Sequence, residues 1–130
     1  MDKIKVVVAE SDMSVIGDLA TLIGRDENIY LAGTAKNGME AWEMISTIQP
    51  DVIVMELLMP YMDGFALMEK INSEVPMSKK PKIIVTSTMS NQTIVRESFL
   101  MGANYFMVKP YHMESVTKRI KQMCTYNIEN

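Results

Sequence analysis

The sequence predicts an α/β domain built on a five-stranded parallel sheet, doubly wound, with helices on both of its faces. Five short runs of apolar residues, rich in Val, Ile or aromatic side chains, are spread along the chain. The segments between these runs carry apolar residues at helical spacing. Five alternations of strand and helix are typical of a parallel sheet whose crossover connections are helical.

The expected strands are residues 4–9, 29–35, 52–55, 83–86 and 105–108. The third, fourth and fifth runs are almost continuously apolar, which indicates strands that are covered on both faces. Between them, apolar positions repeat at helical spacing in the following sets: Val15, Leu19 and Leu22; Ala41, Ile45 and Ile48; Phe65, Met68 and Ile71; Val116, Ile120 and Met123.

Two segments are interpreted from other signals. Residues 93–101 are predicted to form the remaining helix, with Gly102 as its C-terminal stop. Residues 73–81 are polar and contain two prolines, so we expect a loop there.

The bulk properties limit the classes of protein. A chain of 130 residues, 48% of them hydrophobic, is long enough for one domain with a sizeable core. The net charge of −3 argues against direct nucleic-acid binding by this domain. The apolar run at residues 4–9 is too short for a signal peptide or a membrane span. Cys124 is the single cysteine, which excludes an internal disulfide and favours a reducing compartment, so we expect a cytoplasmic protein.

Polar side chains gather where the predicted strands end. Glu10 and Ser11 follow the first strand, Glu56 follows the third, and Lys109 follows the fifth. In an open parallel sheet, ligands bind beyond the carboxyl ends of the strands. Such a group of acids could hold Mg²⁺, and the lysine could neutralise an anion. A buried Glu–Lys pair that only closes the end of the sheet is the equally open alternative.

Further motifs point to a family. Met-Pro-Tyr-Met-Asp-Gly at 59–64 follows Glu56, Lys-Pro-Tyr at 109–111 follows Phe106, and Asn37-Gly38 and Gly102-Ala103 occupy helix and strand boundaries. In this order and spacing, the chain resembles the response-regulator receiver domain of the CheY-like superfamily. Residues 3–9, 35–41 and 103–115 are most similar to the receivers of sporulation-initiation response regulators. We therefore expect a receiver domain over residues 1–124 and a tail or linker at 125–130.

The resemblance implies a phosphate site at the carboxyl end of the sheet. Receivers accept a phosphoryl group on an Asp at the end of the third strand, where this chain has Glu56. They hold Mg²⁺ with that Asp, a backbone carbonyl, here that of Leu58, and two adjacent acids, here Glu10 and Ser11. Ser11 thus occupies a degenerate acid position.

The resemblance also assigns the switch residues. Thr86 would contact the phosphoryl group, and Lys109 would pair with it. Phe106 stands at the place of the switching aromatic residue, and the bond between Lys109 and Pro110 is expected to be cis.

Two departures weaken the phosphate site. Glu56 is longer than Asp by one methylene, about 1.5 Å of reach, and Ser11 removes a charge from the metal site. We therefore expect little or no phosphorylation, no catalytic residue, no enzymatic activity and no cofactor beyond weak Mg²⁺. Glu56 would then either imitate a phosphate in part, with bonds to Lys109 and Thr86, or lock one rigid state.

A working Mg²⁺-dependent phosphoacceptor of a two-component system is the alternative hypothesis. A flavodoxin-like cofactor binder is disfavoured, because residues 10–13 are acidic and contain no glycine.

Receivers usually signal through the face made by the fourth helix, the fifth strand and the fifth helix. The candidate contact residues on this output face are Arg96, Tyr105, Lys118 and Arg119. The expected role is regulation of transcription or sporulation-type signalling, through a homodimer or through contact with a partner such as a C-terminal DNA-binding domain. No contact with a membrane is expected.

Overall fold

The computed structural model describes residues 2–124 and confirms the predicted fold class. The strands are β1 (Ile4–Ala9), β2 (Ile29–Ala35), β3 (Val52–Glu56), β4 (Lys82–Ser87) and β5 (Tyr105–Val108). All neighbouring pairs are parallel, in the order β2-β1-β3-β4-β5. The order reverses beside β1, and this reversal is the place where open α/β sheets bind ligands.

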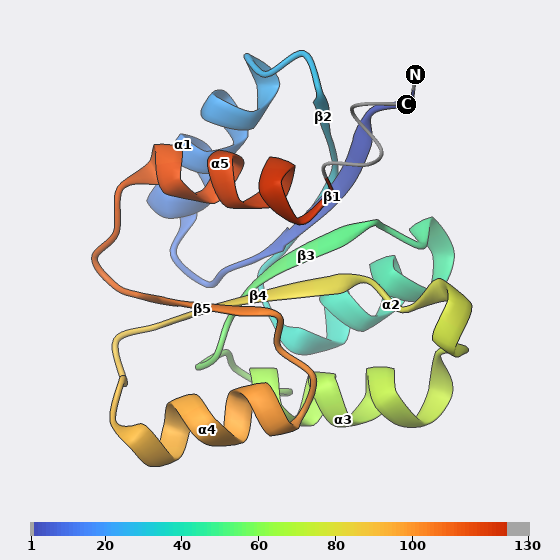
Figure 1. Cartoon of the computed structure of the whole chain (residues 1–130), viewed down its shortest axis with the longest axis vertical. Coiled ribbons are helices and arrows are strands. Elements are labelled where there is room, and N and C mark those ends of the chain that lie inside the picture. The colour runs from blue at the N-terminus through green and yellow to red at the C-terminus, as the bar shows by residue number, and fades with distance from the viewer. Residues whose placement is uncertain (1, 125–130) are drawn as a thin grey trace.

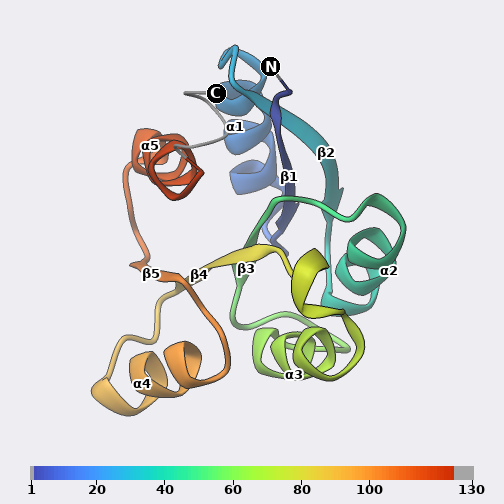
Figure 2. The ribbon, with the colours of Figure 1, turned by 45° about the vertical axis from the view of Figure 1, so that its right-hand side comes forward.

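Helices cover both faces of the sheet (Figure 1). One face carries α1 (Met13–Gly24) and α5 (Met113–Met123), and the other carries α2 (Gly38–Ile48), α3 (Gly64–Glu74) and α4 (Gln92–Leu100). The same division is visible from a second direction in Figure 2. Within residues 2–124, no helix is both long and apolar enough to cross a membrane.

Each face of the sheet has its own apolar core. Alternate residues of the central strands point to opposite faces, as strand geometry requires. Ile53 and Met55 join the core under α2 and α3, whereas Val52 and Val54 join the core under α1 and α5. This double burial explains the unbroken apolar runs in the sequence.

The predicted boundaries differ from the observed ones at a few points. β3 includes Glu56, and β4 is one residue longer at each end than predicted. The helix predicted at 93–101 runs from Gln92 to Leu100, and Gly102 follows it with a φ of 114°, as expected of a glycine stop.

The loop predicted at residues 73–81 is wrong in part. The helix α3 continues to Glu74, and a short 3₁₀ helix, η1 (Met77–Lys79), follows Pro76. The fixed φ of proline suits the position before a helical turn, so Pro76 starts η1 instead of only breaking the chain.

A glycine fixes the loop that follows β3. Asn37 caps α2 by accepting a hydrogen bond from the Glu40 N–H, and Gly38 lies directly beneath the backbone carbonyl of Met62. A Cβ atom at Gly38 would clash with that carbonyl. The absence of a side chain at Gly38 therefore lets the loop after Glu56 pack closely against α2.

Candidate functional site

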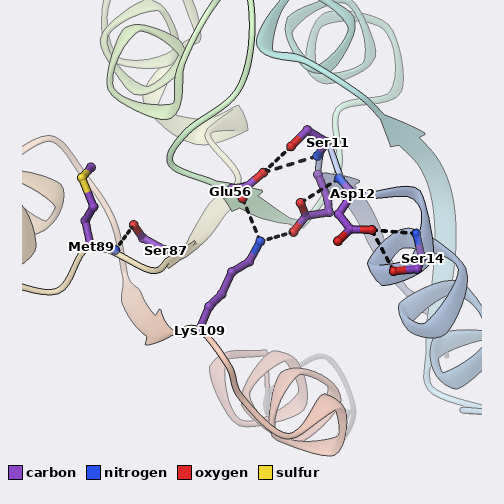
Figure 3. A network of polar contacts seen from close by, with 8 residues as sticks. Ser11, Asp12, Ser14, Glu56, Ser87, Met89 and Lys109 are labelled. Atoms are coloured by element: carbon purple, nitrogen blue, oxygen red, sulfur yellow. Dashed lines mark hydrogen bonds and ion pairs between the residues drawn. The ribbon is translucent and has the colours of Figure 1, made fainter.

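The side chains of Glu10, Glu56 and Lys109 come together at the carboxyl end of the sheet (Figure 3). Ala9 of β1 pairs with Met55 of β3, so Glu10 and Glu56, one residue further on, lie side by side. Lys109 follows β5, and its long side chain reaches back over the sheet toward both carboxylates.

The Lys109 ammonium bridges the two acids. Its Nζ donates to Glu10 Oε1 at 2.6 Å and to Glu56 Oε1 at 2.8 Å. The Glu10 side chain is 3% exposed, while those of Glu56 and Lys109 are each 16% exposed. Charges this far removed from water interact strongly, so the charge on each of the three groups depends on the other two.

The remaining carboxylate oxygens are also bound. Ser11 Oγ donates to Glu56 Oε2 at 2.8 Å, and the Ser11 N–H lies 3.4 Å from the same oxygen. The Asp12 N–H donates to Glu10 Oε2 at 3.0 Å. Every carboxylate oxygen of Glu10 and Glu56 therefore accepts a hydrogen bond from the protein itself.

Asp12 takes no part in holding these acids through its side chain. Its carboxylate caps α1 by accepting hydrogen bonds from Ser14, from the N–H at 2.9 Å and from Oγ at 2.7 Å. This confirms the prediction that Asp12 caps the first helix and points away from the acid site.

The two acids have pKa values shifted in opposite directions. Burial raises the pKa of the Glu10 carboxyl, and the adjacent Glu56 raises it further, so it lies above its usual value despite Lys109. Burial also acts to raise the pKa of Glu56. Hydrogen bonds with Glu10, Lys109 and Ser11 outweigh that effect, so the pKa of the Glu56 carboxyl is lowered. Glu56 is thus the acid that holds its negative charge more firmly.

Lys109 keeps its charge. Burial acts to lower the pKa of its ammonium, but the hydrogen bonds to Glu10 and Glu56 act more strongly in the other direction. The pKa of Lys109 is therefore raised above its usual value, and the bridge is present at neutral pH.

The hydroxyl that binds Glu56 is not the predicted one. Within the described residues, the Glu56 carboxylate bonds to Ser11 and Lys109, and the expected hydrogen bond from Thr86 is not formed. Thr86 nevertheless pairs with Glu56 in the ladder between β3 and β4, and both residues lie on the face of the sheet that carries Val54 and Ile84.

Ser87, the last residue of β4, lies on the face of the sheet opposite to Thr86 and Glu56. It lies two positions after Val85, which pairs with Phe106, so Ser87 and Phe106 share one face of the sheet. Ser87 is buried, and its Oγ accepts a hydrogen bond from the Met89 N–H at 2.9 Å. Ser87 therefore does not replace Thr86 beside Glu56, and the contact that the sequence did not indicate is the hydrogen bond from Ser11 to Glu56.

Phe106 is half-buried and packs against the core that lies under α2 and α3. The Lys109–Pro110 bond is cis, as the resemblance implied. Leu58 has a side chain that is largely exposed, 51% for the residue. A pocket of about 400 Å³ adjoins the stem of Lys109, and Tyr111, which lines it, has a buried hydroxyl without a hydrogen-bond partner among residues 2–124.

The candidate output residues lie on or beside α4, β5 and α5. Arg96 and Lys118 are exposed. The Arg119 guanidinium lies over the Tyr105 ring, 3.8 Å from its centroid, so these two side chains are already in contact with each other.

The donor set for a metal ion is small. Residues 2–124 contain no group of three or more His, Cys, Asp or Glu side chains placed to hold a metal. Glu10 and Glu56 supply two carboxylates at the position where the family binds its ion, and Ser11 adds no charge.

Comparison with known proteins places this geometry in a class. The response regulator domain of Thermotoga maritima CheB is 26% identical to this chain. The match covers 92% of this chain and 95% of that domain, with a TM-score of 0.82. The receiver domain of Francisella response regulator 1452 has 23% identity, coverages of 96% and 99%, and a TM-score of 0.85. A LuxR-family DNA-binding response regulator from Staphylococcus aureus has 18% identity, coverages of 92% and 97%, and a TM-score of 0.83.

These likenesses define a domain with the receiver fold. The family model of the response regulator receiver domain matches residues 6–121. The chain therefore belongs to the response regulator receiver family, whose members act in signal transduction.

Proposed function

We propose that this receiver domain signals without being phosphorylated and that it is not an enzyme. One observation supports the proposal above all others: both oxygens of the Glu56 carboxylate are engaged, Oε1 by Lys109 and Oε2 by Ser11. A carboxylate in these contacts is held as a structural anion and is not free to attack a phosphoryl donor.

The position of the Glu56 carboxylate also opposes phosphoryl transfer. Such transfer depends on positioning and on electrostatic stabilisation of the transition state. An extra methylene moves the oxygens by about 1.5 Å, and a misplacement of about 1 Å can cost about a hundredfold in rate. Release of Glu56 would also require breaking its charge-assisted hydrogen bonds to Lys109 and Ser11.

Magnesium does not fit this donor set well. The ion prefers several oxygen ligands in octahedral geometry and usually binds to free carboxylates. Here the ammonium of Lys109 already lies between the carboxylates of Glu10 and Glu56. A divalent ion would have to displace that cation, so we propose that Mg²⁺ binding is weak or absent.

The contacts of β4 favour a fixed state over a switched one. The Ser87 hydroxyl is engaged with the Met89 N–H, and Glu56 makes its bonds toward β1 and β5. Within residues 2–124 Glu56 makes no hydrogen bond to Thr86, so it does not draw the Thr86 hydroxyl toward the site. With a charge of −1 against about −2 for a phosphate, Glu56 would also be a weak imitation of a phosphorylated Asp.

Under this proposal, the output is carried by a constitutive surface. The output face of Arg96, Tyr105, Lys118 and Arg119 would form a homodimer or contact a partner, with a DNA-binding domain as one candidate. The Staphylococcus aureus protein of this fold is a DNA-binding response regulator. Transcriptional or sporulation-type signalling in the cytoplasm remains the prediction made from the sequence.

Acetyl phosphate with Mg²⁺, followed by intact mass measurement, tests the proposal. We expect no mass gain in the parent protein. Glu56→Asp restores the acceptor but not the second metal-binding acid, so we expect poor labelling. Adding Ser11→Asp to Glu56→Asp should give clear labelling, which would locate the defect in these two positions.

The matched control is Ser11→Asp alone, which supplies the metal-binding acid without the acceptor and should stay unlabelled. Stable addition of one phosphoryl group to Glu56 in the parent protein would refute the proposal and favour the phosphoacceptor alternative. A Mg²⁺ titration of the parent that saturates at low millimolar concentration, and weakens in Glu10→Ala, would point the same way.

Dimerisation through the output face is tested by sedimentation velocity over a concentration series. We expect self-association that is reduced in Lys118→Glu and unchanged in Lys36→Glu, because Lys36 lies at the exposed end of β2, away from α4 and α5. A monomer at every concentration would exclude the homodimer and leave a heterologous partner as the proposed output.

A further inference from the structure

The amino end of the sheet, opposite Glu56, carries two adjoining pockets. One, of about 260 Å³, is lined by residues that include Ser78, Lys79, Lys80 and Lys82. The other, of about 220 Å³, is lined by residues that include Trp42, Val75 and Pro76. Gln49 and Lys79 line both pockets, so the two pockets adjoin, and we call them together the amino-end groove. The helix η1, yellow-green in Figure 2, supplies Ser78 and Lys79 to it.

The basic half of the amino-end groove has excess positive charge. Within residues 2–124, Lys79, Lys80 and Lys82 form no ion pair, although Lys80 and Lys82 are half-buried. Asp51 is the acid in this pocket, and its carboxylate accepts a hydrogen bond from the Lys5 N–H. Among the described residues that line this pocket, three ammonium groups against one carboxylate leave an excess of two positive charges, in a chain whose net charge is −3.

The other half of the amino-end groove, which we call the apolar half, has a mixed lining. Trp42, Ile45, Val75 and Pro76 supply its apolar walls, and Ser46, Gln49, Glu74 and Lys79 supply polar ones. Its acid, Glu74, is neutralised by Lys70 at 2.7 Å, and the Lys70 ammonium also lies 5.1 Å from the centroid of the Trp42 ring. This half therefore offers an indole edge and apolar walls to a flat ring, without an uncompensated negative charge.

The residue that joins the two halves has an uncommon backbone conformation. Gln49, which ends α2, has a φ of 54° and lies in the left-handed region. That position is usually taken by glycine, which adopts it without steric cost. Strained residues of this kind tend to occur at ligand sites, where the side chain is needed. Gln49 lines both the basic and the apolar half, and its amide has both donor and acceptor groups.

We propose that the amino-end groove binds a nucleoside diphosphate. The two phosphates would lie against Lys79, Lys80, Lys82 and the Ser78 hydroxyl, and the base would lie against Trp42 and Pro76. Ammonium and hydroxyl donors bind phosphate through charge-assisted hydrogen bonds, and a base stacks or packs on aromatic and apolar side chains. This binding needs no residue of the site at Glu56, so it goes beyond the proposed function and is independent of it.

Trp42 is the single tryptophan, so its fluorescence reports on ligand binding in the apolar half. The chain is titrated with ADP in EDTA, and calorimetry is run in parallel with ADP, AMP, adenosine and pyrophosphate. We expect saturable quenching by ADP, weaker binding of pyrophosphate and AMP, and weakest binding of adenosine. Heat from pyrophosphate without a change in Trp42 fluorescence would place the phosphates in the basic half, as proposed.

Variants separate the two halves of the amino-end groove. Lys80→Ala and Lys82→Ala should each weaken ADP binding by about 10-fold, the loss of one charge-assisted contact. Trp42→Phe, followed by calorimetry, should weaken ADP binding but leave pyrophosphate binding unchanged. Lys36→Ala removes an exposed lysine at the opposite end of the sheet and should leave ADP binding unchanged. Thermal melts of each variant verify that it is folded.

Three results would overturn the proposal. The first is no saturable binding of ADP at millimolar concentration. The second is ADP binding that is the same in Lys80→Ala and Lys82→Ala as in the parent protein. The third is binding of an oligoribonucleotide that tightens with length and is not displaced by ADP, which would assign the lysines to a nucleic-acid surface.

Discussion

The two ends of the sheet differ in whether their charged side chains are paired with one another. At the carboxyl end, Glu10, Glu56 and Lys109 satisfy one another within a nearly buried network. At the amino end, Lys80 and Lys82 line an open groove and have no ion-pair partner within residues 2–124. The carboxyl end is where proteins of this fold class usually bind ligands, yet here the acids and the lysine at that end are already paired with one another. Proximity of charged residues is therefore not enough to predict a ligand site, because what matters is whether the charges are already paired.

The physical difference lies in desolvation. Taking a carboxylate out of water is costly unless a cation and hydrogen bonds replace the lost hydration. Glu10 is 2% exposed and could not remain charged without Lys109 and the Asp12 N–H. The lysines of the amino-end groove keep contact with solvent, so they need no protein partner and remain able to bind an anion.

The largest expected effect is that of Lys109→Met. The variant removes the one cation between two acids and leaves a buried negative charge unpaired. Breaking a buried pair in this way should lower the free energy of unfolding by about 3 kcal/mol. Urea denaturation at pH 7 measures the loss.

The control adds Glu10→Gln and Glu56→Gln to Lys109→Met, which removes all three charges together. Most of the lost stability should return, since the penalty comes from the unpaired acids and not from the missing lysine itself. If Lys109→Met cost less than about 1 kcal/mol, the carboxyl end would not be the tightly coupled network described here.

Ser11→Ala should have a smaller effect. It removes the hydroxyl that donates to Glu56 Oε2 at 2.8 Å, while the bond from Lys109 remains. We expect a loss of about 1 kcal/mol in the free energy of unfolding, because Ser11 is exposed and water can replace its hydroxyl. Ser11→Thr, which keeps a hydroxyl, is the matched control, and equal stability losses in both variants would argue against this hydrogen bond.

The pH dependence of stability distinguishes the two acids by sign. The lowered pKa of Glu56 means that its charge stabilises the fold above pH 4.5, and that this contribution is lost as pH falls through the folded-state pKa. The stability advantage of the parent protein over Glu56→Gln should therefore shrink in acid. The raised pKa of Glu10 has the opposite effect on stability. The stability of the parent protein should therefore rise relative to that of Glu10→Gln as pH falls from 7 toward 4.5.

Thermal melts between pH 3 and pH 7 in steps of about half a unit would measure both differences over the range in which carboxyl groups titrate. Parallel curves for the two variants would show that Glu10 and Glu56 are electrostatically equivalent. That outcome would contradict the opposite pKa directions that distinguish the two acids.

The sequence predicted the fold well because apolar periodicity records burial directly. The bounds of β1, β2 and β5 agree with the predicted residues, and the double burial of β3 was visible as an unbroken apolar run. The part missed was η1, where two prolines in a polar stretch indicated a loop. A single 3₁₀ turn buries nothing, so it leaves no periodic apolar signal.

The candidate site was predicted less completely. The pairing of Glu56 with Lys109 followed from strand ends that meet at one edge of the sheet, and the structure contains it. The second contact of Lys109, to Glu10, and the bond from Ser11 depend on rotamers that spacing does not encode. Thr86 pairs with Glu56 along the strands but makes no hydrogen bond to it within residues 2–124, because backbone pairing does not fix which donor a side-chain carboxylate takes.

The smallest expected effects belong to the amino end. Lys80→Ala and Lys82→Ala should each change the free energy of unfolding by no more than about 0.5 kcal/mol, because neither ammonium has an ion-pair partner among residues 2–124. The matched control is Lys121→Ala at the same end of the sheet. Lys121 pairs with Asp26 at 2.7 Å, and burial of Asp26 is outweighed by Lys121 and the Asn28 N–H, so the pKa of Asp26 is lowered.

We expect Lys121→Ala to cost about 1 kcal/mol at pH 7 in a urea denaturation. That cost should diminish as pH falls through the lowered pKa of Asp26, because the carboxylate then loses its charge in the folded protein. Losses of equal size in Lys80→Ala, Lys82→Ala and Lys121→Ala would mean that the groove lysines also contribute to the stability of the fold. The contrast between paired charges at the carboxyl end and unpaired lysines at the amino end would then fail, because lysines that stabilise the fold through the chain's own groups are not free to bind an anion.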